Sequence, residues 1–150
     1  MGMETDTVTA VKEALDAGIF VVAAAGNTGI ESADVSVPAN IRGVIAVGAD
    51  RSSGLTWGDS ASGSETDPYT GQPRTYPDQK PEITAPGVNI FSTASTSLNP
   101  PYAYSSGTSD STVFVSGALA LLLEKFGEDI AGDNNKICLL YTSPSPRDLV

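Results

Sequence analysis

Ser109 is the residue of this sequence best suited to covalent chemistry. It follows Gly107 and Thr108, comes after a short extended stretch, and precedes an apolar run of helical length. A serine at such a strand-to-helix turn presents its hydroxyl at a helix N-terminus, where unpaired backbone N–H groups and the helix dipole favour developing negative charge. The pattern indicates a nucleophile, although a lone serine at this place is more often a helix N-cap.

Asn27 is the second candidate. It follows Gly26 at the end of an apolar run that begins at Ile19. Ligands of open α/β sheets bind beyond the carboxyl ends of the strands, so this amide is well placed to face a site. There it could donate a hydrogen bond to the oxyanion of an acyl transfer. Taken alone, an asparagine after glycine is more often only a turn residue.

The composition limits what these two residues could do and with which partners. The chain has no histidine, the usual general base for a serine nucleophile. Its 18 acidic and 8 basic residues give a net charge of −10, which argues against nucleic acid and anionic membranes as partners. The single cysteine, Cys138, excludes an internal disulfide, and no apolar run is long enough to span a membrane.

Alternating helices and strands are expected to position the two candidates. The sequence predicts a helix over residues 6–18, with Asp6 or Thr7 as its cap and Gly18 at its end. Residues 19–25 and 43–49 are short, apolar on both faces and rich in β-branched side chains, as is typical of central strands in a parallel sheet. The order of these elements predicts a layered α/β architecture.

The rest of the chain is less regular. Residues 52–80 read as a long surface loop with a short strand near 55–57. Further extended segments are expected at 81–87, 88–92 and 102–105. The helix expected over 109–126 is apolar nearly all round, which predicts that it is buried, with Gly117 packed closely against a neighbour.

Six motifs in one order resemble those of the subtilisin-like serine proteases, from about residue 2 to residue 127. They are AAGN at 24–27, VPA at 37–39, VIAVGA at 44–49, KPEITAPG at 80–87, IFST at 90–93 and GTS at 107–109. The resemblance implies a three-layer α/β fold with a mostly parallel sheet flanked by helices, of which this chain holds an incomplete, C-terminal part. It also implies hydrolysis of peptide bonds through an acyl-enzyme.

The resemblance assigns roles to single residues. Ser109 matches the family nucleophile. Asn27 matches the side-chain donor of the oxyanion hole, with the backbone N–H of Ser109 as the second donor. Val37–Pro38 matches a site that can hold a cis proline.

Substrate binding is assigned in the same way. Ala24, Ala25 and Gly26 match the small-residue wall of the primary specificity pocket, and Ser36 falls near its base. Gly2 matches a glycine of the opposing substrate-binding segment. Small residues there leave room for a substrate side chain and let the substrate backbone pair as an extra strand.

The chain also departs from the family pattern. Asp110 follows the nucleophile, and Val113 and Phe114 stand where the family has Pro-His. The family's catalytic aspartate and histidine precede the first motif, so the chain alone is expected to lack triad catalysis. The leading hypothesis is a fragment of a serine endopeptidase that acylates Ser109. The alternatives are an inactive subtilase-like domain that serves as a binding or structural module, and an unrelated α/β anion-binding domain.

The remaining expectations concern domains, ions and location. Residues 1–127 are interpreted as the C-terminal part of a peptidase domain, 128–136 as its end or a linker, and 137–150 as a non-native tail. No cofactor is expected to be required and no metal ligand is assigned. Calcium, a common structural ion of the family, would have the acidic loop of Asp59, Glu65, Asp67 and Asp78 as its candidate site, but a solvated loop is preferred. Polypeptide substrates and an extracellular or cell-envelope location are implied by the family, and the oligomeric state is left open.

Overall fold

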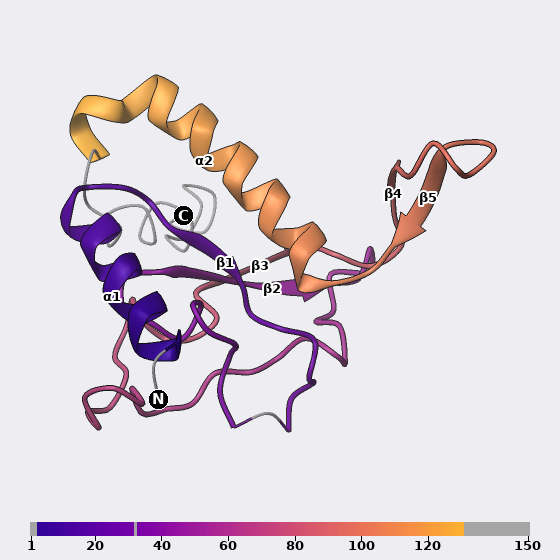
Figure 1. The fold of residues 1–150 in the computed structure, drawn as a ribbon. Helices are drawn as coiled ribbons and strands as arrows, with labels where there is room; N and C mark the ends of the chain where they lie inside the picture. Colours follow the sequence, from indigo (N-terminus) through magenta and orange to yellow (C-terminus); the bar gives the residue numbers. More distant parts are fainter. Residues whose placement is uncertain (1–2, 32, 131–150) are drawn as a thin grey trace, which may run out of the picture.

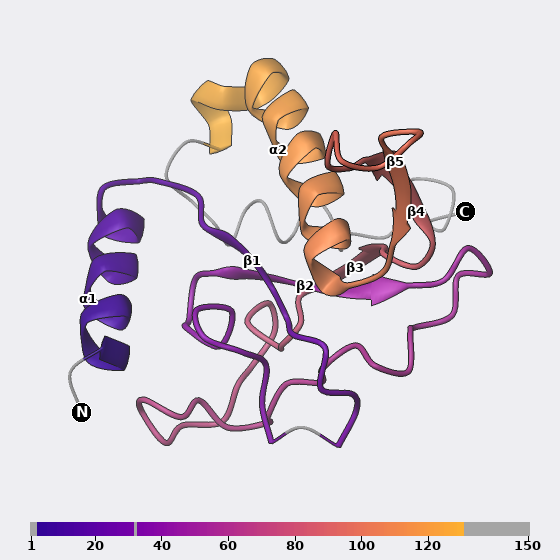
Figure 2. The ribbon, with the colours of Figure 1, turned by 45° about the vertical axis from the view of Figure 1, so that its right-hand side comes forward.

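A parallel sheet lies between two helices in the computed structural model, which describes residues 3–31 and 33–130. Strands β1 (Val22–Ala24), β2 (Ile45–Asp50) and β3 (Ile83–Pro86) pair in parallel in the order β1-β2-β3. Helix α1 (Met3–Asp16) lies on one side and α2 (Thr108–Ile130) crosses the other (Figures 1 and 2). The predicted three-layer α/β fold is confirmed.

Alternation along β2 explains the two apolar layers. Successive side chains of a strand point to opposite faces. Ala46 packs with Val8 on the α1 side, whereas Ile45 and Val47 pack with Val115 of α2 on the other side. The strand is buried from Ile45 to Ala49, as its continuous apolar run predicts.

Helix α1 begins earlier than the sequence suggests. Asp6 and Thr7 were expected to cap it, but the helix starts at Met3 and both residues lie inside it, so that expectation is wrong. Its end agrees better with the prediction. Gly18 has a φ of 79° and donates its N–H to the Leu15 carbonyl at 2.9 Å, which closes the last turn in a left-handed conformation that suits glycine.

Helix α2 runs from Thr108 to Ile130, with a break in helical geometry at Phe126. The expectation that it is buried on all sides is wrong for the described part of the chain. Val115 and Leu119 are buried against the sheet, but Val113 and Leu121 are 70% and 68% exposed. Nothing lies within 4 Å of a Cβ added at Gly117, so the expected close contact is absent there. The outer face of α2 is therefore apolar and uncovered by the described residues.

A hairpin connects β3 to α2. Strands β4 (Ile90–Thr93) and β5 (Tyr102–Ser105) pair antiparallel and project away from the sheet (Figure 1). Phe91 stacks on Tyr102 at 5.7 Å and contacts Tyr104 at 5.0 Å between ring centroids. All three rings are largely exposed, so the hairpin adds to the uncovered apolar surface.

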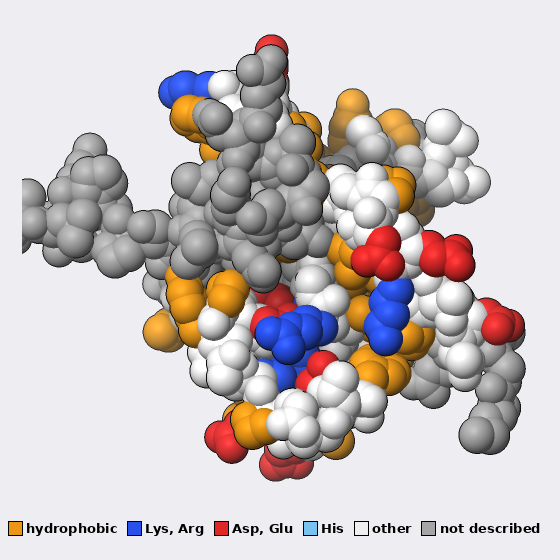
Figure 3. Space-filling model, turned by 90° about the vertical axis from the view of Figure 1, so that its left-hand side faces the viewer, with side chains coloured by type: hydrophobic (Ala, Val, Ile, Leu, Met, Phe, Trp, Pro, Cys, Tyr) orange, Lys and Arg blue, Asp and Glu red, His pale blue; other side chains and the backbone are white. Residues whose placement is uncertain are grey.

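The segment 52–80 forms the expected long loop, with isolated bridges in place of the short strand at 55–57. It is not simply solvated. Asp67 and Asp78 are buried, which contradicts the expectation of freely solvated acidic side chains, and Arg74 and Lys80 are buried with them. On the face of the molecule seen in Figure 3, acidic and basic side chains likewise lie next to each other. The loop is thus held by charge pairs.

Candidate active site

The turn before α2 brings Asn27 and Ser109 to the same place. Thr108, the first residue of α2, is 1% exposed and donates both its N–H and its hydroxyl to Asn27 Oδ1, each at 2.9 Å. The Gly26 N–H donates in turn to Thr108 Oγ1 at 3.1 Å. Three hydrogen bonds therefore tie the carboxyl end of β1 to the residue directly before Ser109.

This arrangement orients the Asn27 amide. Its oxygen is held by two donors from Thr108, so its Nδ2 is the atom left to reach a ligand. Nδ2 lies 3.4 Å from where a Cβ of Gly107 would stand, so a side chain at residue 107 would intrude on the amide. Asn27 and Ser109 are both exposed. A donor fixed in this way does not need to reorganise when charge develops on a bound carbonyl oxygen.

The strand end next to Asn27 is shaped by Gly26 and Ser36. Gly26 has a φ of 110°, and a Cβ there would clash with Ser36 Oγ. The Ser36 N–H donates to the Ala25 carbonyl at 2.7 Å, which draws residue 36 alongside β1. Gly26 and Ser36 therefore lie together beside Asn27, and Ala24 is the last residue of β1.

The other residues assigned to substrate binding differ in their surroundings. Ala25 is fully buried in the core on the α1 side, and its backbone N–H and carbonyl are paired with Val47 and Ser36, so it does not face a ligand. Gly2 lies outside the described residues. The Val37–Pro38 peptide bond is cis, as the resemblance implied.

Two residues with direct contacts at the site were not singled out from the sequence. Thr108 is one, and its position in the sequence between Gly107 and Ser109 could have pointed to it. Ser111 is the other: it is fully buried and donates its hydroxyl to the Ala85 carbonyl at 2.9 Å, which fixes the first turn of α2 on β3. A buried serine inside an apolar helix could have been recognised as an anchor, because buried hydroxyls need partners.

Asp110 lies in the first turn of α2, next to Ser109. Its Oδ1 accepts a hydrogen bond from Ser105 Oγ at 2.5 Å. Its Oδ2 lies 3.7 Å from the position of a Cβ at Gly107, and the same position lies 3.4 Å from Asn27 Nδ2. A carboxylate at a helix N-terminus is electrostatically favourable.

The amino ends of β2 and β3 carry a different polar group, which we call the charged cluster: Arg74, Asp78, Lys80 and Glu82. The Lys80 ammonium donates to the Val44 carbonyl at 2.6 Å and to Glu82 Oε1 at 2.5 Å. Glu82 Oε2 accepts the N–H of Ala46 at 2.8 Å. Burial raises the pKa of Glu82 above its ordinary value of 4.5, and the charge of Lys80 offsets only part of that effect.

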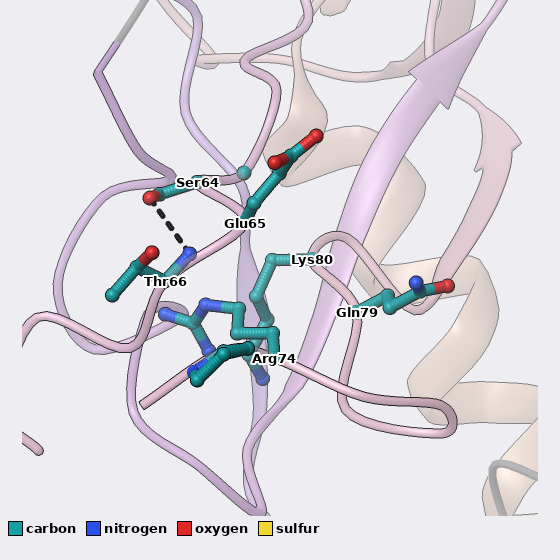
Figure 4. Close-up of a pocket in the computed structure, with 8 residues that line it drawn as sticks. Ser64, Glu65, Thr66, Arg74, Gln79 and Lys80 are labelled. Carbon is teal, nitrogen blue, oxygen red and sulfur yellow. Dashed lines mark hydrogen bonds between the residues drawn. The ribbon is translucent and has the colours of Figure 1, made fainter. Parts of the chain in front are cut away.

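Arg74 and Lys80 also line a cavity of about 470 Å³ (Figure 4). Arg74 Nη2 donates to the Asn40 carbonyl at 2.8 Å and pairs with Asp34 at 3.2 Å. Asp67 and Asp78, two of the residues proposed for calcium, are engaged by backbone N–H groups or by these cations. Within residues 3–31 and 33–130, no three acidic, cysteine or histidine side chains gather as a metal site.

Comparison with known proteins identifies the family. The profile described as "Subtilase family" matches residues 2–144. The chain belongs to the subtilase family. The match includes the turn that holds Asn27 and Ser109.

The relatives that match this chain are longer than it is. It is 34% identical to Serine protease AprX of Bacillus subtilis (strain 168) in an alignment of 146 positions that covers 89% of this chain and 32% of that protein. It is 40% identical to Subtilisin amylosacchariticus of Bacillus subtilis subsp. amylosacchariticus over 119 residues, 78% of this chain and 26% of that protein. The chain therefore spans about a third or less of the length of these relatives.

Solved structures of proteases also match this chain. The self-cleaved protease domain of PatA matches with a TM-score of 0.66 and 31% identity, over 93% of this chain and 47% of that one. The prenylagaramide maturation protease PagA matches with a TM-score of 0.65 and 27% identity, over 93% and 46%. About half of each solved chain thus has no counterpart here. In the described part of this subtilase chain, no helix is long and apolar enough to cross a membrane.

Proposed function

We propose that this chain forms part of a serine endopeptidase that cleaves polypeptides through an acyl-enzyme on Ser109. The supporting observation is the link from Asn27 through Thr108 to the helix turn that presents Ser109. In the reaction, Ser109 Oγ bonds to the carbonyl carbon of the substrate. The C–N bond then breaks, and the hydroxyl proton passes through a base to the leaving amine. Water repeats the sequence to release the acid product.

Two donors would stabilise the tetrahedral intermediate of this reaction. Asn27 Nδ2 and the backbone N–H of Ser109 both lie at the first turn of α2, where the helix dipole adds positive potential. Such donors favour the transition state because negative charge develops on the carbonyl oxygen only as the nucleophile attacks. Ala24, Gly26 and Ser36 would receive the substrate side chain on the acyl side.

The reaction also needs a base, and this chain has no histidine, the usual base for a serine nucleophile. We propose that a further part of the peptidase domain supplies it and covers the apolar face of α2. That face holds Val113, Phe114 and Leu121, all at least half exposed. An apolar surface of this extent is normally covered by a partner segment. The chain by itself is then expected to be inactive.

The test uses a fluorophosphonate probe on the full-length protein that contains this chain. We expect covalent labelling that is lost in Ser109→Ala and slowed in Asn27→Leu, which keeps the side-chain volume but removes the donor. Residues 1–150 alone should not be labelled, and co-expression with the remaining part of the domain should restore labelling. Full-length protein that folds but is never labelled would instead support the inactive subtilase-like module, which the departure at Asp110 favours.

Structural calcium, which no described residue group supports, and an extracellular or cell-envelope location stay as predictions for the full-length protein. Dialysis against a chelator tests the first: a lowered melting temperature that calcium restores would confirm a bound ion. Fractionation of the source cells tests the second.

A further inference from the structure

Asp110 lies next to Ser109, and no described residue forms an ion pair with its carboxylate. The ion pairs of the described residues involve Arg42, Arg74 and Lys80, and none of them includes Asp110. The hydrogen bond from Ser105 Oγ fixes the carboxylate without neutralising it. A fixed, unneutralised charge at this place attracts a cation to the reacting bond.

The groove beside Asp110 is mostly apolar. A groove of about 450 Å³ runs between α2 and the β4–β5 hairpin, and Asp110 is its one charged lining residue within the described chain. Ile90 and Phe91 line the groove on the hairpin side, and Val113 lines it on the α2 side. Asp110 is the groove residue next to the exposed Ser109, so only this end of the groove needs to be open for a role in substrate binding, and a further part of the domain can still cover the rest.

The position of this groove fixes which side of the substrate it would meet. Figures 1 and 2 both show β1 on one side of the first turn of α2 and the β4–β5 hairpin on the other. If a substrate is held by Asn27 and Ser109 with its acyl-side residue near Gly26 and Ser36, its leaving-amine side would extend toward Asp110. The first residue after the cleaved bond would then lie next to the carboxylate.

We propose that Asp110 is a specificity-determining residue that favours lysine or arginine directly after the cleaved bond. This inference rests on the proposed function. The aliphatic stem of a basic side chain would pack along Ile90 and Phe91, and its cationic head would pair with Asp110. An acidic side chain at the same position would meet the Asp110 charge, in a chain whose net charge is −10.

The experiment measures kcat/KM of the full-length enzyme on matched quenched peptides that differ only in the residue after the cleaved bond. We expect the lysine and arginine peptides to be cleaved about 10-fold faster than the leucine peptide, and the glutamate peptide to be slowest. In Asp110→Asn, which keeps an acceptor for Ser105, the lysine-to-leucine ratio should fall close to 1. Asp110→Glu should restore part of the ratio. The wild-type ratio should also shrink at about 1 M salt, because exposed charges are screened there.

A lysine-to-leucine ratio that is unchanged in Asp110→Asn would overturn the proposal, including the case in which all peptides slow equally. A wild-type ratio near 1, or one that does not respond to salt, would also overturn it, and these two results do not depend on the folding of any variant. Labelling by the fluorophosphonate probe distinguishes a failure of the Asp110 role from a failure of the proposed peptidase function. Wild-type enzyme that is labelled but shows no basic preference refutes only the role of Asp110, whereas unlabelled enzyme refutes the proposed function itself.

Discussion

The two ends of the sheet use polar residues in opposite ways. At the carboxyl ends of β1 and β3, Asn27, Thr108 and Ser111 form uncharged hydrogen bonds, and Ser109 remains exposed. At the amino ends of β2 and β3, Lys80 and Glu82 are charged and buried, with side chains that are 0% and 3% exposed.

The polar residues at one end position a candidate site, whereas those at the other end stabilise the fold. The uncharged bonds around Thr108 hold a donor and a hydroxyl in place while leaving both accessible to a ligand. The Lys80 side chain of the charged cluster is 0% exposed. The cluster also replaces missing backbone pairing, since Glu82 accepts the Ala46 N–H where β3 has not yet begun. Substitutions in the charged cluster should therefore lower the unfolding free energy, whereas substitutions at the turn before α2 should mainly lower the reactivity of Ser109.

The largest expected effect is that of Lys80→Met. The variant leaves Glu82 as a buried charge without its main partner and leaves the Val44 carbonyl without its donor. Breaking a buried pair in this way costs about 3–5 kcal/mol of unfolding free energy. Urea denaturation of the full-length protein measures it. Arg51→Met, at an exposed side chain, is the matched control and should change stability by less than about 0.5 kcal/mol. Equal effects of the two variants would show that the cluster does not stabilise the fold.

Thr108→Val should have an intermediate effect that extends to chemistry. It preserves shape but removes the hydroxyl, so the Gly26 N–H loses its acceptor and Asn27 Oδ1 keeps one donor of two. We expect a loss of about 1–3 kcal/mol and slower labelling of Ser109 by the fluorophosphonate probe. Thr108→Ser retains the hydroxyl and should label at nearly the wild-type rate. If Thr108→Val labels as fast as wild type, the orientation of Asn27 does not depend on this residue.

The two ends also differ in how far the sequence predicts them. Asn27 and Ser109 could be found because short motifs end buried strands and open helices, and parallel topology brings those points together. The roles of Asp78, Lys80 and Glu82 could not be predicted, because their pairing depends on the path of a loop whose sequence has no periodicity. The outer face of α2 was predicted to be buried, since apolar periodicity records what a helix packs against in the complete domain. The described residues supply only the sheet side of that packing.

Glu82→Gln should have the smallest effect, and it is a test of pH dependence. Because burial raises the pKa of Glu82 above 4.5, the folded state binds more protons than the unfolded state between pH 4.5 and that raised value. The stabilisation from the neutral carboxyl is complete below pH 4.5 and is lost as the pH rises through the folded-state pKa. The unfolding free energy should fall across this window by at most about 1.4 kcal/mol per pH unit, the limit for one proton.

The amide that replaces the Glu82 carboxyl cannot titrate but can still accept the Ala46 N–H, so Glu82→Gln should lack this fall. The exposed control Asp16→Asn should retain it. Parallel urea titrations from about pH 4 to about pH 8 would measure the slopes. If the unfolding free energy of Glu82→Gln falls with pH as steeply as that of wild type, a group other than Glu82 takes up the proton. The charged cluster would then hold Glu82 ionised over the pH range of the titration.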